Sequence, residues 1–430
     1  MKHLKKKKIF GTKFFSSTSS NKLLDGKKVS IIGGGPGGLT LAKILQDRGI
    51  DVKIYEREKN RAQRIQGGSL DMHSESGLKA IKEANLEKQF EKLYLKQAES
   101  TTVADHNAQI LFQIPSIKIL PFRPEIERGD LRDLFLDSLR PGTVEWDHHF
   151  TSLKQLNNNK IEISFENGKK IESDLVIGSD GAHSKTRQFL TNSKPIYTGI
   201  CLIQGELKQV SQTLPQFKSL INDGALFCLG QEKAIIAHSQ KNDRMLYYVS
   251  FRKAKEEMEK MNEEIRKDPL YARSYLEKKL REWNQLFHQL FLLSQPTFVF
   301  RPIFETGHED IKWETNHNLT LLGDAAHLMA PFAGEGANIA MHDSLELANS
   351  LTSQNHATIH SSLISFEQKM FERFSKKKLE TKFGEDILHS PNASQQIFKI
   401  FLGPFASFKN LIPPLFRGLN KLTDFIGVTK

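Results

Sequence analysis

The sequence predicts an α/β fold whose central sheet ends in three ligand-facing loops. Short apolar runs at residues 29–32, 175–178 and 319–322 are typical of strands covered on both faces. Each run leads directly into a loop that contains glycine, aspartate or both. Because ligands of open α/β sheets bind at the carboxyl ends of the strands, we expect the three loops to meet at one site.

The first of these junctions carries the most specific pattern. Gly33, Gly35 and Gly38 form a G-x-G-x-x-G frame between the first strand and a helical apolar pattern at residues 39–45. The first glycine permits a tight turn, the second lets a pyrophosphate approach the backbone, and the third lets the helix pack closely on the strand. The helix N-terminus then offers free N–H groups to the phosphates. The junction therefore predicts a dinucleotide site.

Glu56 supports this prediction. It ends the next strand, residues 52–55, about 20 residues after the glycine frame, where a carboxylate can accept hydrogen bonds from an adenosine ribose. A purely structural glycine-rich turn is the alternative interpretation.

The rest of the chain is expected to alternate strands and helices and then to end in helices. Between residues 64 and 71, two glycines lie beside Arg64 and Asp71, which suggests a loop that lets the backbone approach a ligand. Expected helices cover residues 74–90, 127–139, 252–293, 334–350 and 364–430, and expected strands lie within 98–122, 143–179, 199–207, 225–229 and 245–251.

The net charge of +11 is concentrated at the N-terminus. Residues 1–24 hold seven lysines and no acidic residue, and the remainder of the chain has a balance of +4. Since no DNA- or RNA-binding motif accompanies the charge, we expect no nucleic-acid partner. The basic leader, residues 1–28, is either a disordered tail or a mitochondrial transit peptide, although it lacks the arginines that transit peptides favour. We expect a cytoplasmic protein, with a mitochondrial one as the alternative.

The composition does not favour a membrane-spanning segment or a metal site. No apolar run reaches the roughly 18 residues that span a membrane. Residues 397–419 mix large apolar and basic residues, so they either pack on the body as a helix or lie on a membrane surface. Cys201 and Cys228 are too few for a disulfide framework or a cysteine-rich metal site. We therefore expect two core thiols and no metal.

The three junctions resemble those of the flavin-dependent aromatic-hydroxylase-type (class A) monooxygenases. That family shows a G-x-G-x-x-G frame, an Asp-Gly motif and a Gly-Asp motif, and Asp180-Gly181 and Gly323-Asp324 follow the glycine frame here in that order. Within the family the sequence is most similar to the TetX-type tetracycline-inactivating monooxygenases, at residues 67–73, 128–132 and 323–338.

The resemblance covers about residues 28–375 and implies a domain organisation. It predicts a Rossmann-like FAD-binding domain of the para-hydroxybenzoate hydroxylase type, an inserted β-sheet substrate domain and a helical C-terminal segment. The expected FAD-binding domain comprises residues 29–97, 123–195 and 296–375, the substrate domain 98–122 and 196–295, and the C-terminal segment 376–430.

The resemblance also assigns roles by motif position. The implied FAD contacts are Gly33, Gly35, Gly38, Glu56, Arg57, Asp71, Arg128, Asp180, Asp324, Gly336 and Asn338, and Arg64 falls where the family meets NADPH. Arg128 offers a fixed fork of donors to a phosphate or flavin edge, with a surface ion pair as the alternative. The turn at Gly334–Asn338 opens a helix whose positive end can face the flavin pyrimidine. The implied flavin-proximal residues are Pro331, Phe332, Gly334 and Gly336.

The implied substrate positions depart in part from the tetracycline enzymes. Gln204 matches the family's glutamine, while Lys233 stands where an arginine is expected and Tyr247 where a histidine is expected. Because lysine lacks the bidentate fork of arginine, tetracycline is in doubt as the native substrate.

The implied reaction uses FAD, NADPH and dioxygen. NADPH reduces the flavin, dioxygen gives a flavin C4a-hydroperoxide, and one oxygen atom passes to an aromatic or polyketide-like small molecule. In such enzymes the protein binds, orients and excludes water, so we expect no acid–base catalytic residue. We also expect a monomer.

Four alternatives stay open. Two are other FAD oxidoreductases of the same fold, namely a prenyl-chain reductase and a halogenase. Halogenases of this fold carry a Trp-x-Trp segment, which the three tryptophans here, Trp146, Trp283 and Trp313, do not form. The third is a quinone-ring hydroxylase of mitochondria. The fourth is a binding protein without activity, which would require decay of the FAD contacts.

Overall fold

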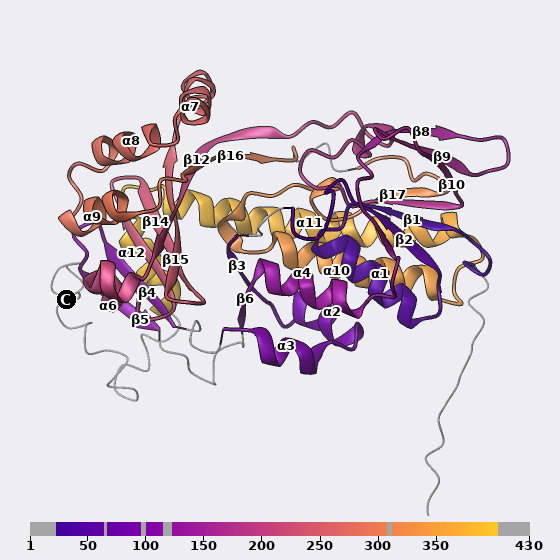
Figure 1. The fold of residues 1–430 in the computed structure, drawn as a ribbon, viewed down its shortest axis with the longest axis horizontal. Helices are drawn as coiled ribbons and strands as arrows, with labels where there is room; N and C mark the ends of the chain where they lie inside the picture. Colours follow the sequence, from indigo (N-terminus) through magenta and orange to yellow (C-terminus); the bar gives the residue numbers. More distant parts are fainter. Residues whose placement is uncertain (1–22, 64–66, 96–99, 115–122, 308–311, 403–430) are drawn as a thin grey trace, which may run out of the picture.

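The computed structural model describes residues 23–63, 67–95, 100–114, 123–307 and 312–402. It has two β-sheet regions at opposite ends of an elongated molecule, and one long helix, α11 (Ile359–Leu388), runs between them (Figure 1). The predicted leader therefore falls largely outside the described residues.

The first region contains a parallel five-stranded sheet. Its strand order is β17-β11-β1-β2-β7, with β1 at the centre. The strands are β1 (Val29–Ile32), β2 (Val52–Tyr55), β7 (Val144–Glu145), β11 (Leu175–Gly178) and β17 (Leu319–Leu321). The three strands predicted from apolar runs are thus adjacent, and their carboxyl ends lie at one edge of the sheet.

Alternate residues of this sheet face two different layers. Ile31 and its neighbours on the same face pack against helices α1 (Pro36–Asp47), α4 (Arg128–Ser138) and α10 (Gly336–Thr352) in the main core. Ile32 and the opposite face pack against an antiparallel sheet of β8, β9 and β10. These strands are β8 (Phe150–Gln155), β9 (Ile161–Phe165) and β10 (Lys170–Ser173). Burial on both faces explains why the central strands are continuously apolar.

The second region is a seven-stranded sheet in the order β16-β12-β15-β14-β13-β4-β5. One face packs against helices α5 to α9, and the other faces α12 (Ala393–Leu402) and the first region. The strands are β4 (Thr101–Asp105), β5 (Ile110–Ile114), β12 (Ile196–Lys208), β13 (Ala225–Gly230), β14 (Lys233–Gln240), β15 (Arg244–Arg252) and β16 (Val299–Glu305). The helices are α5 (Val210–Thr213), α6 (Pro215–Ile221), α7 (Lys255–Lys267), α8 (Tyr271–Lys279) and α9 (Gln285–Leu293).

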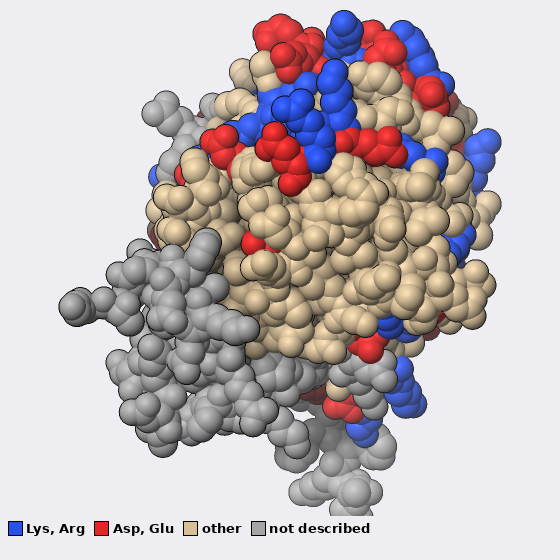
Figure 2. Space-filling model, turned by 90° about the vertical axis from the view of Figure 1, so that its left-hand side faces the viewer, with Lys and Arg blue, Asp and Glu red and all other residues tan. Residues whose placement is uncertain are grey.

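Figure 2 looks onto this end of the molecule. Lysine and arginine side chains gather in its upper part among acidic ones, and the broad surface below them is largely uncharged.

Local structure differs from the sequence-based expectation in two places. The expected helix at residues 74–90 is two short helices, α2 (Gly77–Glu83) and α3 (Glu87–Leu93), because Asn85 takes a left-handed conformation with a φ of 56°. The expected loop before residue 72 ends as a strand, β3 (Ser69–Asp71), which pairs with β6 (Glu125–Glu127).

The predicted domain boundaries at residues 296 and 376 separate residues that the structure joins. Strand β16 pairs with β12 in the seven-stranded sheet, although residues 296–375 are predicted to belong to the FAD-binding domain. Helix α11 continues unbroken through residues 375 and 376 and joins the two regions. Among the described residues, no helix is both long enough and apolar enough to cross a membrane. Residues 403–430 lie outside the described part of the chain.

Candidate cofactor and substrate site

The three glycines of the first junction have different surroundings. A Cβ atom on Gly33, whose φ is 105°, would lie 2.5 Å from the carbonyl oxygen of Ser179, and one on Gly38 would lie 2.2 Å from the carbonyl oxygen of Gly33. A Cβ atom on Gly35 would meet nothing within 4 Å. The first and third glycines therefore allow close packing, and the second faces open space at the start of α1, as a phosphate site requires.

Glu56 is held at the end of β2 by backbone donors. Its carboxylate accepts hydrogen bonds from the N–H of Gly34 at 2.6 Å and of Glu58 at 3.0 Å, and the residue is 8 % exposed. The carboxylate is thus fixed beside the glycine turn, at the position that a ribose hydroxyl would need.

A cavity of about 210 Å³ opens at this junction. Its floor is the glycine turn, and its walls come from β2, α4, the β7–β8 loop and the Asp180 loop. The predicted site residues that line it are Gly33, Gly35, Glu56, Arg57, Arg128 and Asp180.

Asp180 shapes its own loop. The carboxylate accepts hydrogen bonds from the hydroxyls of Ser184 and Thr186, both at 2.6 Å, and from the N–H groups of Lys185 at 2.8 Å and Thr186 at 3.1 Å. Its acceptor sites are therefore largely used within the turn, as in an Asx-type cap.

Arg187, which the sequence analysis did not single out, links the second and third junctions. Its guanidinium is buried and donates to the backbone carbonyls of Ala325 at 2.8 Å and Asp324 at 2.5 Å. The Asp324 carboxylate itself has no hydrogen-bond donor among the described residues. Burial raises the pKa of Asp324 above its ordinary value, although His327, Arg128 and Arg187 act in the opposite direction. A half-buried acceptor without a donor among the described residues fits a ligand hydroxyl.

Asp343 is a second residue of this site that the sequence did not predict. Asp343 is fully buried, and its carboxylate accepts hydrogen bonds from His327 at 2.6 Å, Arg373 at 2.9 Å and the N–H of Gly323 at 3.0 Å. Burial alone would raise the pKa of Asp343, but His327 and Arg373 together lower it to about 2. This network fixes the third junction to α10 and α11.

The turn before α10 is tied to strand β3 by Asn338. The Asn338 amide donates to the carbonyls of Asp71 at 2.8 Å and Gly334 at 3.2 Å, and it accepts from the N–H of His73 at 2.9 Å. A Cβ atom on Gly334, whose φ is 66°, would lie 2.8 Å from the Asp71 carboxylate. Gly334, Asp71 and Asn338 thus lie together, and the Asn338 amide is occupied by backbone partners.

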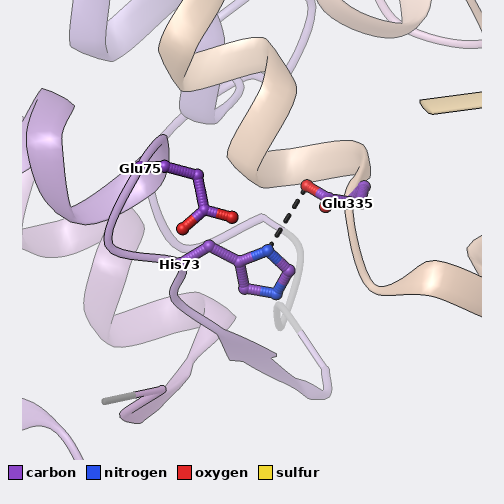
Figure 3. A group of neighbouring side chains, drawn as sticks. All are labelled: His73, Glu75 and Glu335. Atoms are coloured by element: carbon purple, nitrogen blue, oxygen red, sulfur yellow. Dashed lines mark ion pairs between the residues drawn. The ribbon is translucent and has the colours of Figure 1, made fainter. Parts of the chain in front are cut away.

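His73 lies between carboxylates in this region (Figure 3). Its Nε2 is 2.8 Å from Asp71 Oδ2, and its Nδ1 is 3.4 Å from Glu335 Oε2. Burial lowers the pKa of His73, but the hydrogen bond to Asp71 and the ion pair with Glu335 outweigh burial and raise it to about 9. Ligand atoms of His73, Glu75 and Glu335 lie within 4.8 Å of one another, as in a metal site. Because His73 is protonated at neutral pH and Lys377 pairs with Glu335 at 2.6 Å, the arrangement is better described as an ion-pair network.

The predicted flavin-proximal turn contacts the C-terminal helix. Pro331 is exposed, whereas Phe332 packs edge-on against His389 with ring centroids 5.3 Å apart. A Cβ atom on Gly384 would lie 3.0 Å from the Phe332 carbonyl oxygen, so a glycine in α11 permits this approach. Phe332 and Tyr248 also join an apolar cluster of Ile200, Leu202, Ile303 and Ala330. The turn and the seven-stranded sheet therefore form facing walls.

One of the three predicted substrate residues lies on this inner face. Gln204 accepts a hydrogen bond from Arg301 Nε at 2.8 Å, and its Nε2 is 4.0 Å from the Cβ position of Gly67. Gln204, Arg301 and Tyr248 share the face that looks toward the first region. Arg301 and Tyr248 can be found only once the register of the strands is known.

The other two predicted substrate residues lie on the opposite, outer face of the sheet. Tyr247 is fully buried on the helix-covered face, where its ring lies across Gly205 and its hydroxyl bonds Ser294 at 2.8 Å. Lys233 also lies on the outer side of the sheet, beside α8. Successive residues of a strand point to opposite faces, so an assignment shifted by one residue selects the wrong face. Arg64, the predicted NADPH residue, lies outside the described residues.

Comparison with known proteins gives a family and a set of similar folds. Residues 27–281 and 310–373 match the family model described as FAD binding domain. The chain is 27 % identical over 383 residues to the monooxygenase asqM of Emericella nidulans, covering 78 % of this chain and 86 % of that protein. The structure resembles Klebsiella pneumoniae R204Q HpxO complexed with FAD, with a TM-score of 0.73, 20 % identity and coverage of 88 % of this chain and 94 % of that one. It also resembles the tetracycline destructase Tet(51), with a TM-score of 0.66, 20 % identity and coverage of 90 % and 98 %. The chain therefore belongs to the FAD binding domain family, with the fold of the class A flavoprotein monooxygenases.

Proposed function

We propose that this flavoprotein monooxygenase binds FAD across the three junctions, is reduced by NADPH and hydroxylates an aromatic or polyketide-like small molecule. The observation that carries the proposal is a pair of features suited to a ligand at the two ends of the site. One is the open space at Gly35, and the other is the Asp324 carboxylate, which has no donor among the described residues.

The residues present fit the separate parts of FAD. The open turn at Gly35 and the N-terminus of α1 would hold the pyrophosphate, and Glu56 would accept from the adenosine ribose. Arg128, at the start of α4, lines the same cavity and would supply a charged donor. Asp324, whose Oδ1 is 3.9 Å from the Cβ position of Gly336, would accept a ribityl hydroxyl close to the turn before α10.

When bound, the flavin supplies the oxygen-activating chemistry, so the protein's task is to place the substrate and exclude water. The N-terminus of α10 is held by Asn338 and by the His73–Glu335 contact, and it presents the positive end of its dipole to the site. Phe332 and Leu202 form apolar walls that limit water next to the substrate. No side chain is required as an acid or a base in this arrangement.

The inner face of the seven-stranded sheet supports a flat, partly polar substrate. Tyr248 and Phe332 offer ring surfaces, while Gln204 and Arg301 form one polar group beside them. The Arg301 guanidinium favours a substrate with an ionised or strongly accepting oxygen. Tetracycline-like compounds are one class that meets this description, as do smaller hydroxylated aromatic acids.

The test is a reduction and oxygenation assay on the purified chain. We expect yellow protein after addition of FAD, NADPH oxidation that rises with a productive substrate, and product mass increased by one oxygen atom. Hydrogen peroxide is measured in parallel, because productive substrates increase NADPH use without increasing peroxide. A protein that stays colourless with excess FAD would contradict the whole proposal. Reduction by NADH but not by NADPH would contradict only the choice of NADPH as the reductant.

A further inference from the structure

An open groove of about 680 Å³ lies on the outer side of the seven-stranded sheet, away from the flavin site. It is formed by α8, the segment that follows it and the β13–β14 turn. The residues that line it are Gln231, Lys233, Tyr271, Ser274, Tyr275, Lys278, Lys279, Arg281 and Glu282. This volume is in the range of small-molecule sites. The gathering of basic side chains in the upper part of Figure 2 lies at this end of the molecule.

The charges of the groove are unbalanced. Three lysines and one arginine line it, against the single acidic side chain of Glu282. Burial and the positive charge of Lys279 both lower the pKa of Lys233, although Glu282 and Glu232 oppose them. Lys278 is exposed and makes no ion pair among the described residues. An anion in the groove would relieve the repulsion between these ammonium groups.

Gln231 forms a fixed floor beneath the cations. Its Oε1 accepts from the indole N–H of Trp283 at 3.2 Å and lies 3.4 Å from Lys233 Nζ, and its Nε2 donates to Glu282 at 3.1 Å. The Lys233 ammonium also donates to the Gln231 carbonyl at 3.0 Å. The floor is therefore ordered by the protein's own contacts before any ligand arrives.

The turn that carries Gln231 is strained. Gln231 and Glu232 connect β13 to β14 with φ values of 52° and 59°. A two-residue turn with both φ values positive favours Asn-Gly or Asp-Gly, and neither glutamine nor glutamate adopts it readily. Such strain is typical of functional sites, where the surrounding structure holds an unfavourable conformation. Here it places Gln231 and Lys233 together at the groove.

We propose that this groove binds a phosphate-bearing small molecule that also carries a flat ring. The flexible lysines act as point charges suited to a phosphate, and the half-exposed ring of Tyr271 offers a surface against which a base or similar ring stacks. The site is separate from the flavin site because Lys233 projects from the face of β14 opposite to Ala234 and Ile236, which face α12. It therefore does not depend on the function proposed above.

Binding is tested on the full chain saturated with FAD, so that the adenosine end of the flavin site is filled. Isothermal titration calorimetry uses ADP, inorganic pyrophosphate and adenosine as probes. We expect ADP to bind more tightly than pyrophosphate and adenosine to bind least, because the phosphates meet the lysines. The double variant Lys278→Ala/Lys279→Ala should bind ADP at least about tenfold more weakly, and added salt should reduce the difference.

A matched control separates this site from general attraction of anions. Lys255→Ala/Lys260→Ala removes the same charge from exposed positions on α7 and should leave ADP binding unchanged. Lysine acetylation followed by mass spectrometry should show protection of Lys278 and Lys279 by ADP, with Lys255 and Lys260 unprotected. Absence of saturable ADP binding, or binding that survives the Lys278/Lys279 substitutions, would overturn the proposal even if both variants fold as the parent does.

Discussion

The Nδ1 atom of His73 lies 3.4 Å from a carboxylate oxygen of Glu335, and His73 is only 1 % exposed. Glu335 is the residue directly before α10, so this contact joins the segment that follows strand β3 to the turn that faces the proposed flavin position. Nε2 of the same ring is bonded to Asp71. A protonated imidazole therefore holds two carboxylates that would otherwise repel each other.

The first prediction concerns the pH dependence of stability. The pKa of His73 is raised to about 9 in the folded protein, from 6.5. Its stabilising contribution is therefore full below about pH 6.5 and is lost as the pH rises through 9. We expect His73→Gln to lower the free energy of unfolding by about 2 kcal/mol at pH 6 and by much less at pH 10. Urea unfolding at a series of pH values measures the difference.

The same series distinguishes the ion-pair network from a metal site. Glu75→Gln removes an exposed carboxylate of the group and should keep the pH profile of the parent. Treatment with EDTA should leave the unfolding midpoint unchanged, because His73 and Lys377 already supply the positive charges that balance Asp71 and Glu335. Stabilisation by a stoichiometric amount of zinc that disappears in His73→Gln would instead support a metal at this position.

A second prediction separates two glycines of the same turn. Gly35→Ala should fold with a melting temperature close to the parent, since the new Cβ meets nothing within 4 Å, but it should weaken FAD binding at least about tenfold. Gly33→Ala should destabilise the protein itself, because its Cβ would meet the Ser179 carbonyl at a residue with a φ of 105°. Thermal unfolding and FAD titration are measured for both. Equal effects of the two substitutions on FAD affinity and on stability would contradict the assignment.

A third prediction contrasts two aspartates at the third junction, half-buried Asp324 and fully buried Asp343. Asp324→Ala should weaken FAD binding by about 1.5 to 3 kcal/mol, the value of a hydrogen bond to a charged group, with little loss of apoprotein stability. Asp343→Ala should lower stability by about 3 kcal/mol, because it leaves His327 and Arg373 buried without their partner. Chemical denaturation of the apoprotein and flavin fluorescence titration give the two quantities. A larger loss of stability in Asp324→Ala than in Asp343→Ala would contradict these two roles.

The sequence predicts the parts of this site that depend on local backbone geometry. The glycine frame, Glu56 and the Gly334 turn are recognisable because each requires a particular residue type at a fixed spacing. Arg187 and the His327–Asp343 pair escape prediction because they connect segments that are far apart in the chain, and a solitary arginine or histidine has no distinctive pattern. The central strands were predictable since burial on both faces makes them continuously apolar.

The substrate-facing residues, by contrast, could not be predicted from the sequence. Tyr247 and Tyr248 are adjacent, equally aromatic and in the same strand, so composition cannot tell which one faces the ligand. The pairing of Gly205 with Tyr247 places the Tyr247 ring on the helix-covered side, which leaves Tyr248 on the inner face. Lys233 likewise lies on the outer side of the sheet, and the groove that it lines has no recognisable pattern in the sequence.

The last prediction tests directly which of these two tyrosines faces the substrate. Tyr248→Ala should raise the KM of a productive substrate about fivefold, since an aromatic contact contributes about 1 kcal/mol, while the melting temperature changes little. Tyr247→Phe should leave KM unchanged and lower stability by about 1 kcal/mol, because the hydroxyl that bonds Ser294 is lost from the core. Steady-state kinetics of NADPH oxidation with peroxide subtracted, together with thermal unfolding, separates the two effects. If Tyr247→Phe raised KM and Tyr248→Ala did not, the inner face of the sheet would not be the substrate face.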